Sequence, residues 1–163
     1  MLEQKEAYLL LGTNLGDRSG NLRKAVELID YEVGKVFICS SVYETAAWGK
    51  TDQPGFLNQA LGVKSALTPL TMLEALLHIE QKMGRVRLEK WGERLIDIDL
   101  IFYGKDTILN EQHLKLPHPE MHKRRFVLEP LNEIAGDYIH PVFKEKVSSI
   151  LSNLNDELAV QKI

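Results

Sequence analysis

Two aspartates separated by one residue, Asp97 and Asp99, lie in an otherwise apolar stretch, 95–102. Alternation with a period of two predicts a β-strand that carries both carboxylates on one face. The apolar residues of the other face are Ile96, Ile98, Leu100 and Phe102. Same-face neighbours are about 6.5–7 Å apart along a strand, so the two carboxylates could share one divalent ion or hold two. Two aspartates on a solvated sheet face are the alternative, and the pattern alone does not separate these interpretations.

Cationic side chains precede this predicted strand. Arg85 and Arg94 bound a charged segment, and Arg94 is close in sequence to Asp97. Mg²⁺ binds through one or two carboxylates, several waters and substrate phosphates, so arginines beside an aspartate pair suit a polyphosphate. Weak surface salt bridges are the alternative for these arginines. No G-x-x-x-x-G-K-[S/T] stretch is present, which excludes a P-loop. We therefore predict Mg²⁺-dependent transfer of a phosphate-bearing group from a nucleotide.

Glu80 lies on the apolar stripe of a predicted helix. Thr68 is expected to cap this helix, with Pro69 at its first position and Gly84 at its end. The apolar stripe consists of Leu70, Leu73, Leu76, Leu77 and Met83. A carboxylate on a core-facing stripe needs a partner, which a nearby arginine or the metal site could supply. The alternative is a glutamate exposed at the rim of the helix.

A histidine between two prolines, His118, precedes a basic run that contains Arg124. The prolines stiffen the backbone at His118, and the cations that follow could reach a phosphate tail. We therefore expect His118 and Arg124 to bind the substrate. The remaining histidines are interpreted as structural: His78, His113, His122 and His140.

The elements that must position these residues follow from apolar periodicity and turn residues. Strands are predicted over 7–11, 36–43, 56–64 and 95–103. Helices are predicted over 21–31 and 68–84, from near 119, and over 147–154. The order matches the ferredoxin-like β-α-β-β-α-β plan. We therefore predict an α+β fold in which helices flank a central, mostly antiparallel sheet, formed by a single domain over residues 1–163.

Composition limits the class of protein. The chain has 163 residues, 44% of them hydrophobic and 26% charged, as one globular domain requires. A formal charge of -3 argues against a general nucleic-acid binder. The single cysteine favours a reducing compartment, and no apolar run approaches the roughly 18 residues of a membrane span. We expect a cytoplasmic monomer that binds small molecules and neither nucleic acid nor membrane.

Several segments, taken in order, resemble the 6-hydroxymethyl-7,8-dihydropterin pyrophosphokinase family of folate biosynthesis. They are Gly12-Thr13-Asn14-Leu15-Gly16-Asp17, Ser40-Ser41-Val42-Tyr43-Glu44-Thr45, Phe56-Leu57-Asn58, Ile79-Glu80 with Gly84-Arg85, Trp91-Gly92-Glu93-Arg94 leading to Asp97-Ile98-Asp99, and Pro117-His118-Pro119 leading to Arg124 and Phe126-Val127-Leu128. The stretch from Arg94 to Asp99 is the most specific. The chain departs from the family at Ala46 and Ala47, where a proline commonly follows threonine, and this would make the loop less stiff.

The resemblance implies that ATP donates its β,γ-pyrophosphoryl unit to the hydroxymethyl oxygen of the pterin and releases AMP. Asp97 and Asp99 would bind two Mg²⁺ ions. The residues assigned to catalysis are Arg85, Arg94, Asp97 and Asp99. Those assigned to ATP binding are Glu80, Arg85, Arg94, His118 and Arg124. Those assigned to the pterin are Thr45, Ala46, Trp48, Phe56, Asn58 and Phe126.

These assignments are physically reasonable. A flat heterocycle is held well between two aromatic faces, here Phe56 and Phe126, and the amide of Asn58 can both donate to its edge and accept from it. Two alternatives stay open on the sequence alone. One is a ferredoxin-like module that binds RNA through its cations and exposed aromatic residues. The other is a pterin enzyme of another reaction type, such as an aldolase.

Overall fold

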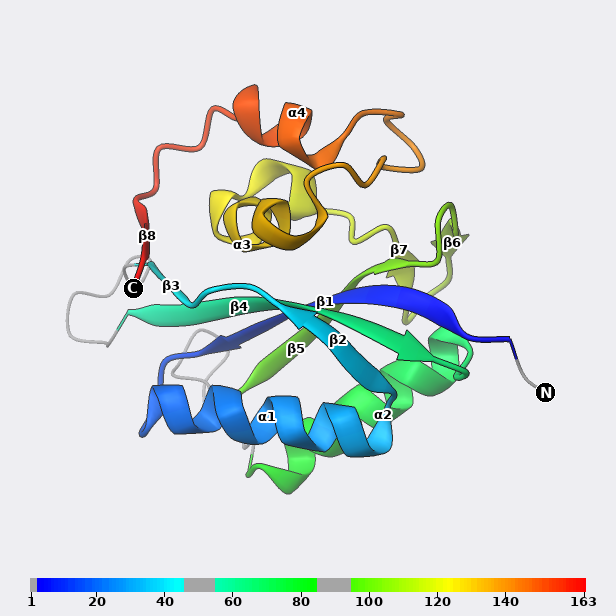
Figure 1. The fold of residues 1–163 in the computed structure, drawn as a ribbon, viewed down its shortest axis with the longest axis vertical. Helices are drawn as coiled ribbons and strands as arrows, with labels where there is room; N and C mark the ends of the chain where they lie inside the picture. Colours follow the sequence, from blue (N-terminus) through cyan, green and yellow to red (C-terminus); the bar gives the residue numbers. More distant parts are fainter. Residues whose placement is uncertain (1–2, 46–54, 85–94) are drawn as a thin grey trace.

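A six-stranded antiparallel sheet organises the chain (Figure 1). The computed structural model describes residues 3–45, 55–84 and 95–163. The strands of the sheet are β1 (Lys5–Thr13), β2 (Lys35–Cys39), β3 (Tyr43–Thr45), β4 (Phe56–Ser65), β5 (Asp97–Tyr103) and β8 (Val160–Lys162). Their order is β5-β1-β4-β3-β8, with β2 also paired to β4. With its helices the chain follows the predicted β-α-β-β-α-β plan, and the antiparallel sheet is confirmed.

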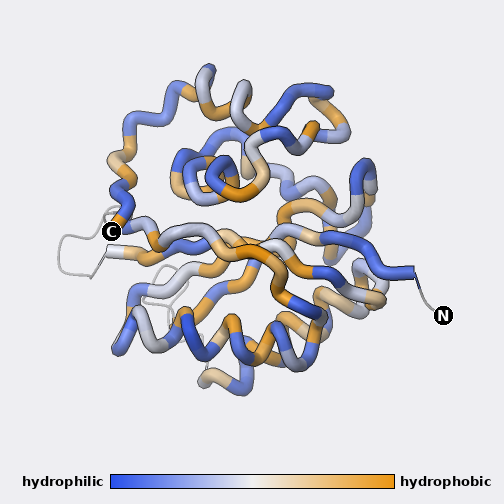
Figure 2. The backbone as a smooth tube through the Cα atoms, in the orientation of Figure 1, coloured by the Kyte–Doolittle hydropathy of each residue, from blue (hydrophilic) through white to orange (hydrophobic). Residues whose placement is uncertain are grey.

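Helices lie on both faces of the sheet (Figure 1). One face carries α1 (Arg18–Glu32) and α2 (Pro69–Lys82), and the other carries α3 (Arg125–Ala135), on which α4 (Val147–Ser152) packs from the side away from the sheet. Each face has its own apolar core, built from alternate residues of the same strands. Figure 2 shows the hydrophobic residues concentrated along the central strands and the helical segments that face them. No helix among the described residues is long and apolar enough to cross a membrane.

Local sequence signals set the starts of α1 and α2. The Asp17 carboxylate accepts a hydrogen bond from the backbone N–H of Gly20 at 3.1 Å, as an N-cap does. Thr68 caps α2 in the same way, with Pro69 at the first position, which confirms the prediction. Gly84 follows the helix with a φ of 87°, a left-handed conformation that costs glycine little.

The apolar stripe predicted for α2 is wrong in part. Leu70 and Leu77 are 43% and 44% exposed. The buried residues of α2 are Met72, Leu76, Ile79 and Glu80. The leucine-rich sequence of this helix permits several stripes, and packing against the sheet selects one that is rotated toward Met72 and Ile79. The rotation leaves Glu80 buried.

Several other segments differ from prediction. The predicted second strand is split into β2 and β3. Between them, Ala60 N donates to the Ser40 hydroxyl at 2.9 Å, and this bond to a side chain interrupts the backbone ladder with β4. The helix expected near residue 119 begins at Arg125, after the short 3₁₀ turn η1 (Met121–Lys123). The strands β6 (Leu109–Asn110), β7 (Lys115–Leu116) and β8 were not predicted. All three are short, so they carry little periodicity.

Candidate active site

Asp97 and Asp99 lie on one face of the sheet, as the sequence predicts. In the register of β1 with β5, Gly12 is opposite Asp97 and Leu10 is opposite Asp99. Residues directly opposite in an antiparallel pair share a face, and Leu10 belongs to the core under α3. The two aspartates therefore point to the α3 side of the sheet. Asp99 is exposed and Asp97 is partly buried.

The opposite face of β5 anchors the strand, with one correction. Ile96, Ile98 and Leu100 are buried in the core under α1 and α2. Phe102 was predicted to join them, but it lies in the other core, beside Tyr138. The register with β1 shifts by one residue between Leu100 and Phe102, and such a bulge turns the rest of the strand over.

Glu80 supports the aspartate strand from behind. It is 4% exposed, and its Oε2 accepts a hydrogen bond from the backbone N–H of Ile98 at 2.7 Å. The strand order places β5 at an edge of the sheet, where an outward N–H lacks a strand partner. The carboxylate takes that role between Asp97 and Asp99. Exposure at the helix rim, the alternative for Glu80, is therefore excluded.

The start of β5 is also tied to β1. The Thr13 hydroxyl donates to the carbonyl oxygen of Leu95 at 2.5 Å, and the Asn21 amide donates to Thr13 Oγ1 at 3.2 Å. These bonds link the end of β1 and the first turns of α1 to the residue that leads into Asp97. They fix the strand in place before its first carboxylate.

His118 lies beside Asp99. Its backbone N–H donates to the Ile101 carbonyl at 3.0 Å, which holds the turn against β5. Its Nδ1 accepts a hydrogen bond from the backbone N–H of Glu120 at 3.2 Å, so the neutral ring carries its proton on Nε2. Burial lowers the pKa of His118; nearby Asp99 opposes this effect, and the Arg124 guanidinium adds to it. Asp99, His118 and Arg124 are therefore electrostatic neighbours, although they are far apart in sequence.

Arg124 and Phe126 flank the start of α3. The Arg124 guanidinium carbon is 5.8 Å from the centroid of the Phe126 ring. Arg124 is exposed, whereas Phe126 is partly buried against the core under α3. Both lie on the side of the sheet to which the aspartates point. The first turn of α3 thus brings a cation and an aromatic ring to the carboxylate face.

A second group of predicted residues lies across β1 from Asp97. Gly12 is opposite both Asp97 and Asn58, so these three share a face in one row across β5, β1 and β4. A Cβ atom at position 12 would be only 2.9 Å from Asn58 Nδ2 and 3.9 Å from Phe56 Cδ1. Because glycine has no Cβ, the Asn58 side chain can lie directly against the backbone of β1 at this position. Thr45 pairs with Phe56 and joins the same face.

Two buried polar atoms of this group lack a hydrogen-bond partner in the part of the chain that the structure describes. Asn58 is 4% exposed, and its amide donates to the Leu11 carbonyl at 3.2 Å, while Oδ1 accepts no hydrogen bond from a described residue. Thr45 is also 4% exposed, and its hydroxyl makes no hydrogen bond to any described residue. Buried polar groups are normally satisfied, so atoms left open at a site suit a polar ligand edge.

Sequence reasoning missed Arg18. Its Nη1 donates to Glu44 Oε2 at 2.6 Å and to the Gly55 carbonyl at 2.8 Å, so it joins the two ends of the segment 46–54 next to Thr45 and Phe56. No local pattern shows this role, because the partners are 26 and 37 residues away. Four predicted site residues, Arg85, Arg94, Ala46 and Trp48, lie outside the described residues, and their roles stay predictions.

The arrangement fits a divalent metal bound through oxygen. Within the ranges 3–45, 55–84 and 95–163, no three His, Cys, Asp or Glu side chains gather as a protein cage for a metal. Asp97 and Asp99 offer two carboxylates on one accessible face. Such a donor set suits Mg²⁺, which takes its other ligands from water and phosphate.

Comparison with known proteins identifies relatives of this chain. A model of the 7,8-dihydro-6-hydroxymethylpterin-pyrophosphokinase family matches residues 8–136. The 2-amino-4-hydroxy-6-hydroxymethyldihydropteridine pyrophosphokinase of Synechocystis sp. is 46% identical over 136 residues, which covers 83% of this chain and 69% of that protein. The protein of the same name from Haemophilus influenzae is 38% identical over 158 residues, which covers 96% of this chain and 95% of that protein.

The fold is shared with a larger protein of known structure. A crystal structure of HPPK-DHPS from Plasmodium falciparum superposes with a TM-score of 0.75 at 19% sequence identity and covers 93% of this chain. The alignment spans only 45% of that protein, so this chain corresponds to less than half of its length. The family match spans most of the residues described above, including both aspartates and the Asn58 group. This chain belongs to the 7,8-dihydro-6-hydroxymethylpterin-pyrophosphokinase family.

Proposed function

We propose that the chain transfers the β,γ-pyrophosphoryl group of ATP to the hydroxyl of 6-hydroxymethyl-7,8-dihydropterin and releases AMP, in a Mg²⁺-dependent reaction of folate biosynthesis. The names of its relatives and the family match support the pair of substrates. The row of Asp97, Gly12 and Asn58 across three strands is the observation that carries the proposal. In this row the Asp97 carboxylate, our candidate metal ligand, shares a face with the Asn58 side chain, whose Oδ1 could accept from the pterin.

The spacing of this row suits the two substrates. Neighbouring strands are about 4.8 Å apart, so Asp97 and Asn58 are separated by roughly 10 Å at the backbone. A pterin whose ring edge bonds Asn58 and Thr45 would extend its hydroxymethyl arm toward the aspartates. Its flat ring would lie between Phe56 and Phe126, with further bonds from the backbone near Ala46 and Trp48.

The nucleotide would lie on the other side of the aspartates. His118 and Arg124 would hold it, because both lie near Asp99, and Arg85 and Arg94 would contact its phosphates. Two Mg²⁺ ions bound by Asp97 and Asp99 would neutralise the phosphate oxygens and help to activate the attacking hydroxyl. The role of Glu80 in ATP binding is then indirect, since its bond to Ile98 N holds the strand between the two aspartates.

The protein contributes position and charge to this reaction. Transfer between phosphate oxygens needs little covalent help, so alignment of the donor and the acceptor accounts for most of the rate. Because Nδ1 of His118 accepts from Glu120 N, the ring proton is on Nε2 and would donate to a phosphate oxygen. We also propose that the protein is a monomer that works in the cytoplasm. The single cysteine favours a reducing compartment, and the net charge of -3 gives no sign of a nucleic-acid partner.

Measurement of AMP release tests the metal assignment. Wild-type protein, Asp97→Asn and Asp99→Asn are incubated with ATP, the pterin alcohol and Mg²⁺, with and without EDTA. Asp137→Asn is the matched control, since that side chain is 95% exposed and lies elsewhere. We expect EDTA to stop wild-type activity, each site variant to lose at least about a hundredfold in kcat, and the control to remain normal. Full activity of either site variant would refute the assigned metal role.

A further inference from the structure

The C-terminal segment 153–163 runs from α4 to the edge of the sheet (Figure 1). On its way it contacts two of the structural elements that carry proposed substrate residues. One is the first turn of α3, which carries Arg124 and Phe126. The other is β3, which carries Thr45. We refer to residues 156–162 as the tail strap.

The first contact is at the start of α3. The helix has no cap from its own sequence, because the side chain of Arg124, its N-cap residue, makes no capping bond. Asp156 supplies the cap from a distance: its Oδ2 accepts from the backbone N–H of Arg125 at 3.0 Å. The carbonyl of Asp156 also accepts from Arg125 Nε at 3.1 Å. A first-turn N–H that lacks a partner within the helix is thereby satisfied.

Asp156 is itself well fixed for this role. Its Oδ1 accepts from the backbone N–H of Leu158 at 3.0 Å, so the two carboxylate oxygens bind two different amides. The backbone hydrogen bonds from Arg125 and Leu158 lower the pKa of Asp156. The carboxylate is therefore ionised at neutral pH, when an N-cap interaction is strongest.

The second contact is with β3. Strand β8 pairs with it in antiparallel register, with Lys162 opposite Tyr43 and Val160 opposite Thr45. The pairing is extended by a bond from Ile163 N to the Val42 carbonyl at 2.9 Å. The tail strap therefore covers the outer edge of the strand that ends at Thr45.

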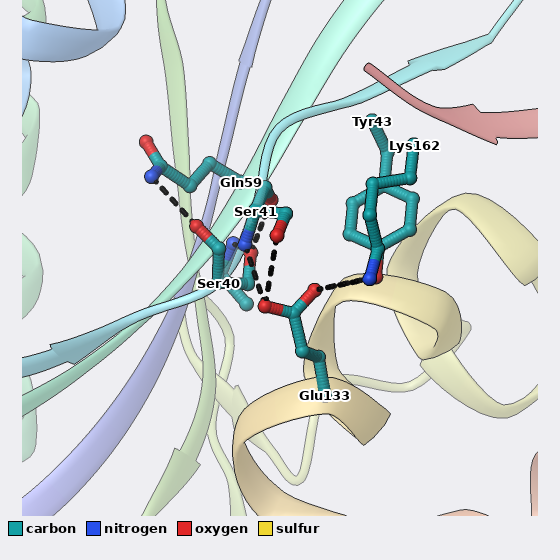
Figure 3. Close-up of polar contacts among 7 residues, drawn as sticks. Ser40, Ser41, Tyr43, Gln59, Glu133 and Lys162 are labelled. Atoms are coloured by element: carbon teal, nitrogen blue, oxygen red, sulfur yellow. Dashed lines mark hydrogen bonds and ion pairs between the residues drawn. The ribbon is translucent and has the colours of Figure 1, made fainter.

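A glutamate on α3 closes the connection between the two elements (Figure 3). Glu133 accepts hydrogen bonds from Ser41 N at 2.8 Å, Ser41 Oγ at 3.0 Å and Tyr43 OH at 2.6 Å. Lys162 Nζ is 3.8 Å from Glu133 Oε1. Burial opposes ionisation, but the donors Tyr43 and Ser41 lower the pKa of Glu133. Helix α3, strand β3 and the tail strap thus form one connected unit.

We propose that the tail strap positions the substrate pocket, and that Asp156 is its main positioning residue. Asp156 sets the first turn of α3 and hence the placement of Arg124 toward ATP and Phe126 toward the pterin. The inference rests on the function proposed above, since it assigns those two residues to the two substrates. We assign Asp156 to neither substrate, and its two hydrogen bonds to Arg125 place its effect at the first turn of α3.

The test compares Asp156→Ala, Asp156→Asn and Glu157→Ala in the full chain. Glu157 is exposed and makes no described contact, so its variant removes the same charge one residue away. Loss of a typical N-cap shifts an equilibrium by about fivefold. We therefore expect Asp156→Ala to raise KM for both ATP and the pterin alcohol about fivefold, with kcat changed by less than about twofold. Asparagine caps helices nearly as well as aspartate, so Asp156→Asn should recover most of the lost affinity.

Hydrogen exchange measured without substrates separates positioning from general stability. Asp156→Ala should speed exchange of the backbone amides 125–128, and Glu157→Ala should leave it unchanged. Faster exchange with both KM values unchanged would overturn the proposal, as would unchanged exchange. If the alanine variant does not fold, Asp156→Glu carries the test, because its longer side chain moves the carboxylate away from Arg125 N while the charge is kept. KM values equal to those of Glu157→Ala together with unaltered exchange in Asp156→Glu would overturn the proposal.

Failure of the proposed function would look different. In that case the wild-type protein would form no AMP with the pterin alcohol, and the assignment of Arg124 and Phe126 to substrates would fall with it. The exchange measurement would still decide whether Asp156 holds the first turn of α3.

Discussion

Replacement of Glu80 by alanine removes the carboxylate that accepts from Ile98 N at 2.7 Å. Glu80 is 4% exposed, so water does not easily replace it, and the N–H of Ile98 would lose a buried acceptor. A buried donor left without its partner costs about 1–3 kcal/mol. For a chain of this size, 1 kcal/mol corresponds to about 2–4 °C in Tm, so Glu80→Ala should lower Tm by roughly 2–12 °C.

Glutamine at position 80 separates the hydrogen bond from the charge. Its amide oxygen can still accept from Ile98 N, although a neutral acceptor contributes about half as much as a charged one. Glu80→Gln should therefore melt between the wild type and Glu80→Ala. Because Ile98 lies between Asp97 and Asp99, the alanine variant should also need more Mg²⁺ for half-maximal AMP formation.

Thermal unfolding followed by circular dichroism measures the first effect, and a Mg²⁺ titration of activity measures the second. Glu74→Ala is the matched control, since Glu74 lies on the exposed side of the same helix. A Tm for Glu80→Ala within about 1 °C of both the wild type and this control would refute the reasoning, because the bond to Ile98 would then contribute nothing measurable.

Two further predictions follow from buried polar groups. Asn58→Ala should raise KM for the pterin alcohol about tenfold and leave KM for ATP unchanged, because we propose that the buried Oδ1, which has no partner among the described residues, accepts from the pterin. Steady-state kinetics with each substrate varied checks this, and equal effects on both KM values would contradict it. His140 is 2% exposed, and burial, with a smaller effect of His122, lowers its pKa from 6.5 to about 4. As the pH falls, His140 is protonated in the unfolded chain before it is protonated in the folded chain. The free energy of unfolding therefore decreases between pH 6.5 and about 4, by up to about 3 kcal/mol. An NMR titration of His140 with a midpoint near 6.5 would contradict this prediction.

Local periodicity was enough to predict the part of the site that lies on one strand. Alternation in 95–102 places Asp97 and Asp99 on a common face, because side chains in a strand alternate with a fixed period. The β-α-β-β-α-β order follows from similar local patterns and leads to the antiparallel sheet. The caps of α2, Thr68 and Pro69, are equally local signals.

The errors arise where packing or distant residues decide the structure. The bulge in β5 moves Phe102 to the other core, and the sequence of the strand shows no turn residue that would reveal it. The leucines of α2 allow several buried stripes, and the sheet selects one that exposes Leu70 and Leu77. The roles of Arg18 and Asp156 depend on partners remote in sequence, so no motif could have indicated them.

The products of a single incubation test the central claim most directly. Wild-type protein is given ATP, Mg²⁺ and 6-hydroxymethyl-7,8-dihydropterin, and both the nucleotide and the pterin are identified by mass spectrometry. The account predicts one AMP for each pterin that gains a diphosphate group. Formation of ADP with a monophosphorylated pterin, or an unchanged pterin beside intact ATP, would contradict it.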